Sequence, residues 1–145
     1  MNEMQLKIKA CSENELFARN TVAAFALPLN PSLAQLSDIK TAVSEAVTNC
    51  IVHGYAGGEG WITVACRIEG EKFVITVSDE GKGIADLQEA LTPFYTSLPG
   101  QERSGMGFTI MQTFMTTLSV DSVPGKGTTV TMSKDFGEKA ESDAG

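Results

Sequence analysis

Strict alternation of apolar and polar residues marks several short segments, and this is the pattern of half-buried β-strands. The segments are Met4–Ala10, Trp61–Ile68, Lys72–Asp79, Leu118–Val123 and Thr128–Ser133. Between two of them, Glu69-Gly70-Glu71 predicts a hairpin turn. In the third segment Asp79 lies on the same face as Ile75 and Val77, because strand side chains alternate. A carboxylate that ends an apolar row is costly unless its hydrogen bonds are satisfied.

Apolar residues recur at three- and four-residue steps in three other segments, which predicts amphipathic helices. The first helix is expected to start at a capping box, Ser12-Glu13-Asn14-Glu15. Its inner face is expected to hold Leu16, Asn20, Ala23, Ala24 and Leu27. The second helix is expected to begin near Asn30–Ser32 and to end at Gly54. The apolar positions of the third helix are Ile110, Met111, Phe114, Met115 and Leu118.

The second helix carries an unusual polar face. Its apolar stripe consists of Leu36, Ile39, Val43, Val47 and Cys50. Glu45 and Asn49 are one turn apart on nearly the opposite side, which they share with Ala42 and Val52. No Lys or Arg lies between positions 40 and 67 to pair with them. A carboxylate beside a carboxamide suits a proton acceptor next to an oxygen ligand for a hard cation, although an ordinary helix surface explains the pair more simply.

Two glycine motifs follow along the chain. Asp79-Glu80-Gly81-Lys82-Gly83 is either a glycine-rich turn or a base pocket, in which the aspartate accepts from an exocyclic amine and the glycines admit a flat ring. Ser104-Gly105-Met106-Gly107 opens the third helix, where free N–H groups and the helix dipole favour phosphate. Residues 86–104 form a long connection of the kind used for lids. Within it, Arg103 is either a phosphate contact or a solvated charge.

Composition narrows the function classes. The net charge of −7 disfavours nucleic acid or anionic lipid as the main partner, and no apolar run approaches the roughly 20 residues of a membrane helix. Cys11, Cys50 and Cys66 lack metal-ligand spacing and are expected to be free thiols in a reducing cytoplasm. His53, the only histidine, is expected to be structural rather than catalytic. One domain over residues 1–136 is expected, with a frayed polar tail over 137–145.

The order of the motifs is more specific than any single motif. E-x-x-x-N on a helix, a strand with D-x-G-x-G, a long loop, G-x-G at a helix and G-T-T on the last strand resemble the GHKL superfamily with its Bergerat-type nucleotide site. Through E-A-V-T-N, H-G-Y and S-E-N-E, the chain is most similar to the small serine kinases that act as anti-sigma factors in endospore-forming bacteria. The resemblance covers essentially the whole chain. It implies an α/β (α+β) two-layer sandwich, in which a mixed, mostly antiparallel sheet carries helices on one face.

The resemblance also implies a role for each motif residue. Glu45 would be the general base for a serine hydroxyl, and Asn49 would bind the Mg²⁺ that bridges the phosphates of ATP. Asp79 would read the adenine amino group, and Thr129 of the G-T-T segment would support that aspartate. The implied nucleotide-binding set is Asn49, Asp79, Gly81, Gly83, Arg103, Ser104, Gly105, Met106, Gly107 and Thr129. The chain has G-M-G-F where the commonest phosphate loop has G-L-G-L, apolar for apolar.

We therefore expect a protein-serine kinase, with ATP and Mg²⁺ as cofactors, that binds and inhibits a sporulation sigma factor and phosphorylates an anti-anti-sigma protein. Glu15 and Arg19 are either a surface ion pair or a contact to a protein partner. A homodimer is expected through the amphipathic first strand. Two alternatives stay open: an ATP-gated binding module with little or no phosphotransfer, and an ATPase module of a larger machine. Glu45 argues against the first, because a pure binding module needs no base.

Overall fold

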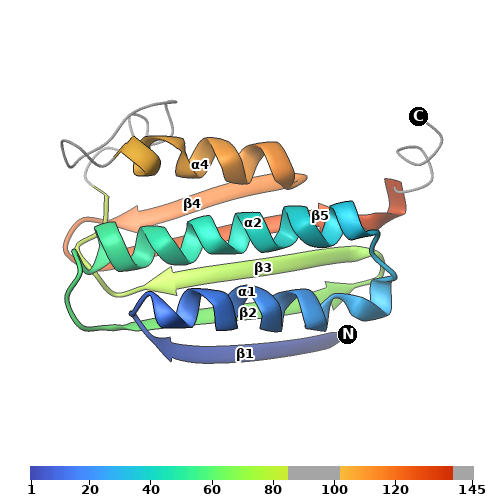
Figure 1. Cartoon of the computed structure of the whole chain (residues 1–145), viewed down its shortest axis with the longest axis horizontal. Coiled ribbons are helices and arrows are strands. Elements are labelled where there is room, and N and C mark those ends of the chain that lie inside the picture. The colour runs from blue at the N-terminus through green and yellow to red at the C-terminus, as the bar shows by residue number, and fades with distance from the viewer. Residues whose placement is uncertain (85–101, 139–145) are drawn as a thin grey trace.

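A two-layer arrangement is seen in the computed structural model, which describes residues 1–84 and 102–138 (Figure 1). The strands are β1 (Asn2–Lys9), β2 (Trp61–Glu69), β3 (Lys72–Asp79), β4 (Thr117–Val123) and β5 (Gly127–Asp135). They lie in the order β1-β2-β3-β5-β4, and every pair of neighbours is antiparallel. The expected two-layer sandwich is confirmed. The sheet was expected to be mixed and mostly antiparallel, and within the described residues it is purely antiparallel.

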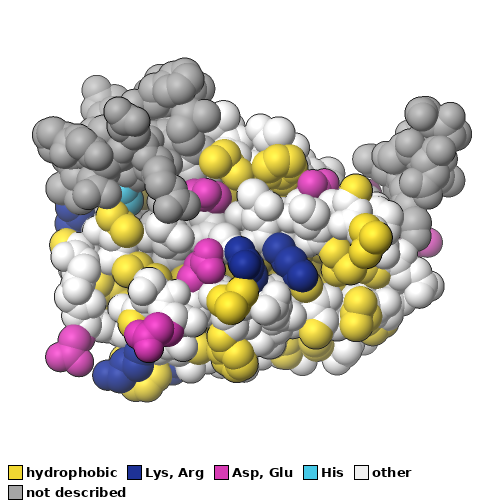
Figure 2. All heavy atoms as spheres, viewed as in Figure 1, with side chains coloured by type: hydrophobic (Ala, Val, Ile, Leu, Met, Phe, Trp, Pro, Cys, Tyr) yellow, Lys and Arg dark blue, Asp and Glu magenta, His cyan; other side chains and the backbone are white. Residues whose placement is uncertain are grey.

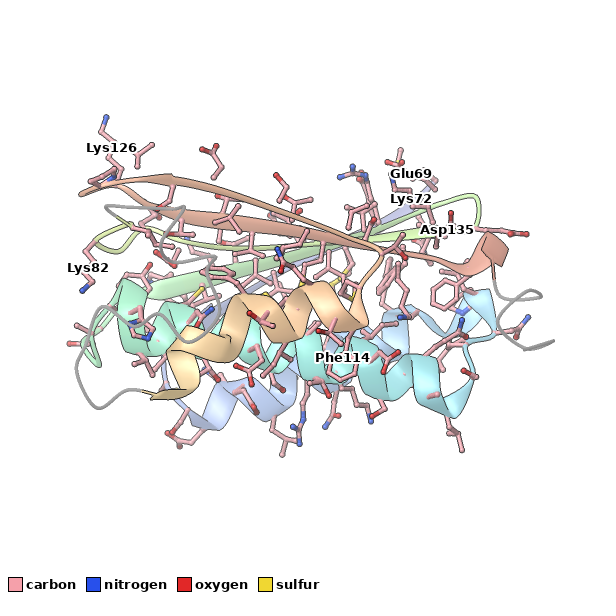
Figure 3. All side chains as sticks on the ribbon, turned by 90° about the horizontal axis from the view of Figure 1, so that it is seen from above. Glu69, Lys72, Lys82, Phe114, Lys126 and Asp135 are labelled. Atoms are coloured by element: carbon pink, nitrogen blue, oxygen red, sulfur yellow. The ribbon has the colours of Figure 1, made fainter. Side chains whose placement is uncertain are left out.

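The helical layer covers one face of this sheet, as the edge-on view in Figure 3 shows. Its long helices are α1 (Glu13–Phe25), α2 (Leu33–Asn49) and α4 (Glu102–Phe114). A π-helical turn, Cys50–Gly54, extends α2, and short 3₁₀ turns lie at Leu27–Leu29 and Phe136–Glu138. No helix in the described ranges is long and apolar enough to cross a membrane.

The core lies between the two layers. The apolar rows of β2, β3 and β5 face the helices, and α2 turns its stripe toward them. Fully buried members of this core are Ile39, Val43, Val47, Ile62, Val64, Phe73, Ile75, Val77, Met111 and Met132. Each such side chain contributes about 1.5–3 kcal/mol relative to an exposed one. Because α2 crosses the middle of the sheet, its C-terminal end is held rigidly over the end of β3 (Figure 1).

The inner face of α1 differs from the predicted one. Leu16 and Phe17 are 50% and 52% exposed, whereas Ala18 and Val22 are fully buried. Small side chains let α1 and α2 approach closely, and Ala42 of α2 is fully buried as well. Of the predicted inner face of α1, Ala23 is buried as expected, whereas Leu16, Asn20, Ala24 and Leu27 are exposed, and the placing of Ala42 on a polar face was wrong.

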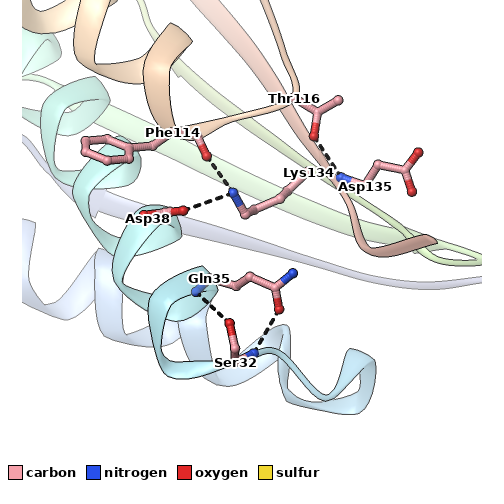
Figure 4. A network of polar contacts seen from close by, with 7 residues as sticks. All are labelled: Ser32, Gln35, Asp38, Phe114, Thr116, Lys134 and Asp135. Carbon is pink, nitrogen blue, oxygen red and sulfur yellow. Dashed lines mark hydrogen bonds and ion pairs between the residues drawn. The ribbon is translucent and has the colours of Figure 1, made fainter. Parts of the chain in front are cut away.

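The capping box is on the second helix rather than on the first. Ser32 Oγ accepts from the backbone N–H of Gln35 at 3.1 Å, and Gln35 Oε1 accepts from the backbone N–H of Ser32 at 2.8 Å (Figure 4). Ser12 precedes α1 as predicted, but its backbone is helical and its side chain makes no capping hydrogen bond. The S-E-N-E motif therefore predicted where α1 starts but not its capping hydrogen bonds, because a capping box needs an N-cap residue with extended backbone.

A buried lysine ties three elements together at the end of the molecule opposite Asp79. Lys134 of β5 donates to the carbonyl of Phe114 at 2.6 Å and to Asp38 Oδ2 of α2 at 3.3 Å (Figure 4). Its side chain is only 13% exposed. The ammonium thereby satisfies the C-terminal end of α4, where a positive charge also suits the helix dipole.

Lys134→Met is expected to lower the free energy of unfolding by about 1–3 kcal/mol, because it leaves the Phe114 carbonyl and the Asp38 carboxylate without their donor. Urea unfolding followed by circular dichroism measures the change. Lys72→Met is the matched control, since Lys72 is exposed on β3, and its effect should stay within about 0.5 kcal/mol. Equal effects of the two variants would contradict the role given to Lys134.

Candidate active site

The end of α2 positions the two polar residues that the sequence singled out. Glu45 and Asn49 lie one turn apart on α2, and both are half-buried. The helix then widens into the π-helical turn, in which the Tyr55 N–H donates to the Cys50 carbonyl at 2.9 Å. This turn brings Gly54 against the carboxylate of Asp79, so that a Cβ on Gly54 would lie 2.8 Å from Asp79 Oδ2. The helix and the strand end therefore meet at one place.

Asp79 is a buried carboxylate with its hydrogen bonds partly satisfied. It is 8% exposed at the end of β3, and its Oδ1 accepts from the N–H of Gly81 at 2.8 Å. The thiol of Cys50 lies beside it and hydrogen-bonds to it. Burial first, and then the charge of Asp79 and this hydrogen bond, raise the pKa of Cys50 well above its ordinary value, so the thiol stays protonated. The row predicted for β3, apolar residues ending in a carboxylate, is confirmed.

The glycines after Asp79 allow backbone segments to touch. A Cβ on Gly81 would lie 2.0 Å from the carbonyl oxygen of Gly54, and the Lys82 N–H donates to that oxygen at 2.9 Å. Gly83 has φ +74°, and a Cβ there would lie 2.3 Å from the carbonyl oxygen of Val123. A Cβ on Gly127, the glycine of the G-T-T segment, would likewise lie 2.1 Å from the backbone carbonyl oxygen of Asp79. Side chains at these three positions would therefore collide with the backbone that surrounds Asp79.

Asn49 faces α4 across the other side of the site. A Cβ on Gly107 would lie 3.0 Å from Asn49 Nδ2, and Gly107 is buried. Asn49 Nδ2 is itself buried and has no hydrogen-bond partner in the described part of the chain. The α4 helix begins at Glu102, so Gly107 lies in its second turn and its N–H is not among the free donors of the helix start. The phosphate-binding role expected of Gly107 stays a prediction.

The remaining predicted phosphate residues lie at the edge of what the structure describes. Arg103, Ser104, Gly105 and Met106 have helical backbone in the first turns of α4, and their side chains lie outside the described residues. The predicted lid, residues 86–104, falls outside them as far as residue 101. The phosphate-binding role of these residues stays a prediction.

Strand register places a different threonine of the G-T-T segment opposite Asp79 from the one that the sequence predicted. Asp79 of β3 stands opposite Thr128 of β5, whereas Thr129 stands opposite Ser78. Because side chains alternate along a strand, Thr128 shares the helix-facing side with Asp79, and Thr129 points to the open face of the sheet. Thr128 also has its hydroxyl 2.8 Å from that of Ser122 on β4. By strand register Thr128, rather than the predicted Thr129, lies on the same face as Asp79, and a supporting role for a threonine stays a prediction.

His53 lies in the π-helical turn one turn after Asn49. Both of its ring nitrogens are buried without a hydrogen-bond partner among residues 1–84 and 102–138. Burial, together with the positive charge of Lys82, lowers the pKa of His53. A neutral, packed imidazole fits the structural role predicted for this residue, which stays a prediction.

The residues at this end of the molecule form a site with two chemically different halves. One half holds a buried carboxylate acceptor, Asp79, which suits a ligand that carries an amine. The other half holds Asn49, with its unpartnered Nδ2, one turn from Glu45. A carboxamide suits the binding of phosphate together with a hard cation, and a carboxylate suits the acceptance of a proton. The donor set therefore fits ATP with Mg²⁺.

Comparison with known proteins agrees with this composition of the site. The family model described as a histidine kinase-like ATPase domain matches residues 13–134. The anti-sigma F factor of Thermoanaerobacter sp. (strain X514) is 55% identical over 136 residues, which are 94% of this chain and 95% of the relative. The anti-sigma F factor of Bacillus subtilis (strain 168) is 51% identical over 134 residues, 92% of each.

Solved structures share the fold at much lower identity. The RsbU and RsbW domains of a Mycobacterium tuberculosis protein match with a TM-score of 0.67 and 20% identity, over 93% of this chain and 32% of that one. The histidine kinase domain of a blue-light activated histidine kinase from Erythrobacter litoralis matches with a TM-score of 0.58 and 16% identity, over 90% of this chain and 63% of that one. At these identities the likeness supports the sheet-and-helix architecture alone.

Proposed function

Because this chain belongs to the histidine kinase-like ATPases and, among them, to the anti-sigma F factor family, we propose that it is a cytoplasmic protein-serine kinase that also acts as an anti-sigma factor. Its cofactors are ATP and Mg²⁺. It binds and inhibits a sporulation sigma factor, and it phosphorylates an anti-anti-sigma protein on a serine.

One observation carries the kinase proposal. The same end of the domain holds a buried acceptor for a base amine, Asp79, and a half-buried carboxylate, Glu45, with Asn49 one turn further along the helix. A nucleotide held at Asp79 has its base in the glycine-lined half and extends its phosphates toward Asn49. A carboxylate placed beyond the phosphates, as Glu45 would be, can accept a proton when a phosphoryl group is transferred to a hydroxyl. It has no such use in a protein that only binds the nucleotide.

The roles follow from the chemistry of each side chain. Bound ATP with Mg²⁺ supplies the phosphoryl group and the positive charge that neutralises it. Asp79 accepts a hydrogen bond from the adenine amine. Asn49 offers its carboxamide oxygen to the cation, and its buried Nδ2 donates to a phosphate oxygen. Glu45 would accept the proton of the serine hydroxyl as that oxygen bonds to the γ-phosphorus of ATP and the bond from this phosphorus to the β,γ-bridging oxygen breaks, so that ADP leaves. The protein thus positions the groups and receives one proton.

Incubation with γ-labelled ATP, Mg²⁺ and a candidate anti-anti-sigma protein tests this proposal. Label is expected on a serine of the partner, and substitution of that serine by alanine should remove it. A complex that forms only with ATP but transfers no label would replace the kinase by a nucleotide-gated binding module. ATP turnover with no protein acceptor would indicate an ATPase module instead.

The α1 helix is the proposed contact surface for a protein partner. Arg19 Nη1 lies 3.9 Å from Glu15 Oε1 and donates to Ser44 Oγ of α2 at 3.4 Å. Arg19 Nε is buried and has no hydrogen-bond partner among the described residues. The exposed side chains of Leu16 and Phe17 lie in the same helix, and Figure 2 shows apolar and basic side chains together over α1 and α2. An arginine whose guanidinium is fixed by neighbouring side chains and surrounded by exposed apolar groups is typical of the centre of a protein–protein interface.

Arg19→Ala is expected to weaken binding of the sigma factor at least about tenfold, because a central interface arginine often contributes more than 1 kcal/mol. ATP binding should not change, since the guanidinium of Arg19 contacts Glu15 and Ser44 rather than Asn49 or Asp79. Surface plasmon resonance with and without ATP measures both. Lys7→Ala, an exposed change on β1, is the control. Unchanged sigma binding by the Arg19 variant would remove α1 from the proposed interface.

We also propose a homodimer. β1 lies at one edge of the sheet, where its outer backbone groups can pair with a second copy. Light scattering that gave a monomeric mass at micromolar concentration would contradict this.

A further inference from the structure

The loop that follows Asp79 is held by hydrogen bonds from the backbone N–H groups of Glu80, Gly81, Lys82 and Ile84. The Gly81 N–H donates to Asp79 itself, and the Lys82 N–H to the carbonyl of Gly54. The two outer donors of the loop, at Glu80 and Ile84, instead reach side-chain hydroxyls. These hydroxyls belong to Tyr55 and Ser122, which the function proposed above does not use.

Tyr55 holds the start of the loop. Its hydroxyl accepts from the Glu80 N–H at 2.8 Å and donates to the Trp61 carbonyl at 2.6 Å, so it bridges the ends of β3 and β2. The ring is held as well, because a Cβ on Gly60 would lie 2.3 Å from Tyr55 Cε1 and only glycine leaves that space. Both hydrogen-bonding functions of the hydroxyl are therefore used on backbone groups of Glu80, which follows Asp79, and of Trp61, which precedes the residue opposite Asp79, Ile62.

Ser122 holds the end of the loop. Its hydroxyl accepts from the Ile84 N–H at 2.7 Å and donates to the Gly127 carbonyl at 3.1 Å. Because its one proton is used there, Thr128 is the donor in the 2.8 Å contact between the two hydroxyls. A backbone bond from the Gly125 N–H to the Lys82 carbonyl, at 2.6 Å, reinforces the same junction. Figure 3 shows Lys82 and Lys126 at the same end of the molecule.

We propose that Tyr55 and Ser122 are positioning residues for adenine recognition, which hold the 79–84 loop from both sides and so fix the Asp79 carboxylate against the base. This inference rests on the proposed ATP function. A carboxylate discriminates between an amine and a carbonyl on the base only if its own direction is fixed, because a mobile carboxylate can turn away from the wrong group. The two hydroxyls supply that restraint without touching the nucleotide.

The test compares ATP with ITP, which carries a carbonyl where adenine has its amine. Tyr55→Phe and Ser122→Ala remove one hydroxyl each. Each variant is expected to raise the Kd for ATP about fivefold and to change the Kd for ITP less than about twofold, so that the ATP:ITP preference falls by the same factor. The rate of phosphotransfer at saturating ATP should stay within about twofold, because the phosphate half of the site is untouched. Isothermal titration with both nucleotides gives these values.

Thr117→Val is the matched control. It also removes a hydroxyl of β4 that contacts a hydroxyl of β5, Ser133, but at the far end of these strands. The ATP:ITP preference should be unchanged in it. A variant that only loosened the fold would weaken binding of both nucleotides equally, and that result for Tyr55→Phe and Ser122→Ala would overturn the inference. If Ser122→Ala does not fold, Tyr55→Phe alone decides, since it keeps the packed ring.

Asp79→Asn separates this inference from the proposed function. If the wild-type protein prefers ATP and the Asp79 variant loses that preference, then an unchanged preference in Tyr55→Phe and Ser122→Ala overturns the positioning role alone. If the wild-type protein shows no preference, or Asp79→Asn keeps it, adenine is not read at Asp79, and both the proposed function and the inference fail.

Discussion

Glu45→Gln is expected to reduce phosphotransfer to the partner serine by roughly 10²–10⁴-fold, while ATP binding changes less than about twofold. Glutamine keeps the size and the hydrogen-bonding oxygen of the side chain, but it cannot take the proton of the serine hydroxyl. Glu45 is half-buried on α2, one turn before Asn49, so the substitution leaves the backbone of the site in place. Single-turnover transfer of labelled phosphate measures the rate, and titration calorimetry measures ATP binding.

The Glu45→Gln variant has a matched control, and two results would contradict the role given to Glu45. Glu13→Gln makes the same chemical change at an exposed position in the first turn of α1 and should leave the rate unaltered. A Glu45 variant that transferred phosphate at the wild-type rate would show that another group, or solvent, accepts the proton. Loss of ATP binding together with activity would assign Glu45 to the binding of nucleotide rather than to the base.

Gly81→Ala is expected to weaken ATP binding at least about tenfold and to lower the free energy of unfolding by about 1–3 kcal/mol. The added Cβ would lie 2.0 Å from the carbonyl oxygen and 2.3 Å from the carbonyl carbon of Gly54. Both atoms are backbone, so the π-helical turn and the loop must separate. The separation breaks the bond from the Lys82 N–H to Gly54 and moves Asp79, whose Oδ1 accepts from the Gly81 N–H.

Gly70→Asn is the matched control for this change. Gly70 lies in the β2–β3 turn with φ +62°, and a Cβ there meets nothing within 4 Å. Asparagine tolerates that backbone region, so both stability and ATP binding should stay near the wild-type values. Nucleotide titration and urea unfolding of the two variants give the comparison. Wild-type ATP affinity in Gly81→Ala would mean that the contact between Gly54 and Gly81 does not shape the site.

Particular residues show which features of the structure the sequence pattern does not determine. The G-T-T segment predicted the strand correctly but selected Thr129, because local alternation says which residues share a face and not which residue of a distant strand they meet. The S-E-N-E letters predicted the start of α1 and a capping box, yet the box lies at Ser32 and Gln35. In α1, Ala18 is buried and Leu16 is exposed, since fit to a neighbouring helix outweighs apolarity.

Periodicity by itself determined the elements and the faces of this protein. Side chains repeat every two residues in a strand and every 3.6 in a helix, so Asp79 had to share a face with Val77, and Glu45 with Asn49. The contacts of the site were decided only by the tertiary structure. Tyr55 meets Glu80 across 25 positions of the chain, and Ser122 meets Ile84 across 38. Such pairs depend on strand register and on the packing of α2 over the sheet, which combine residues from distant segments and leave no periodic trace in the sequence.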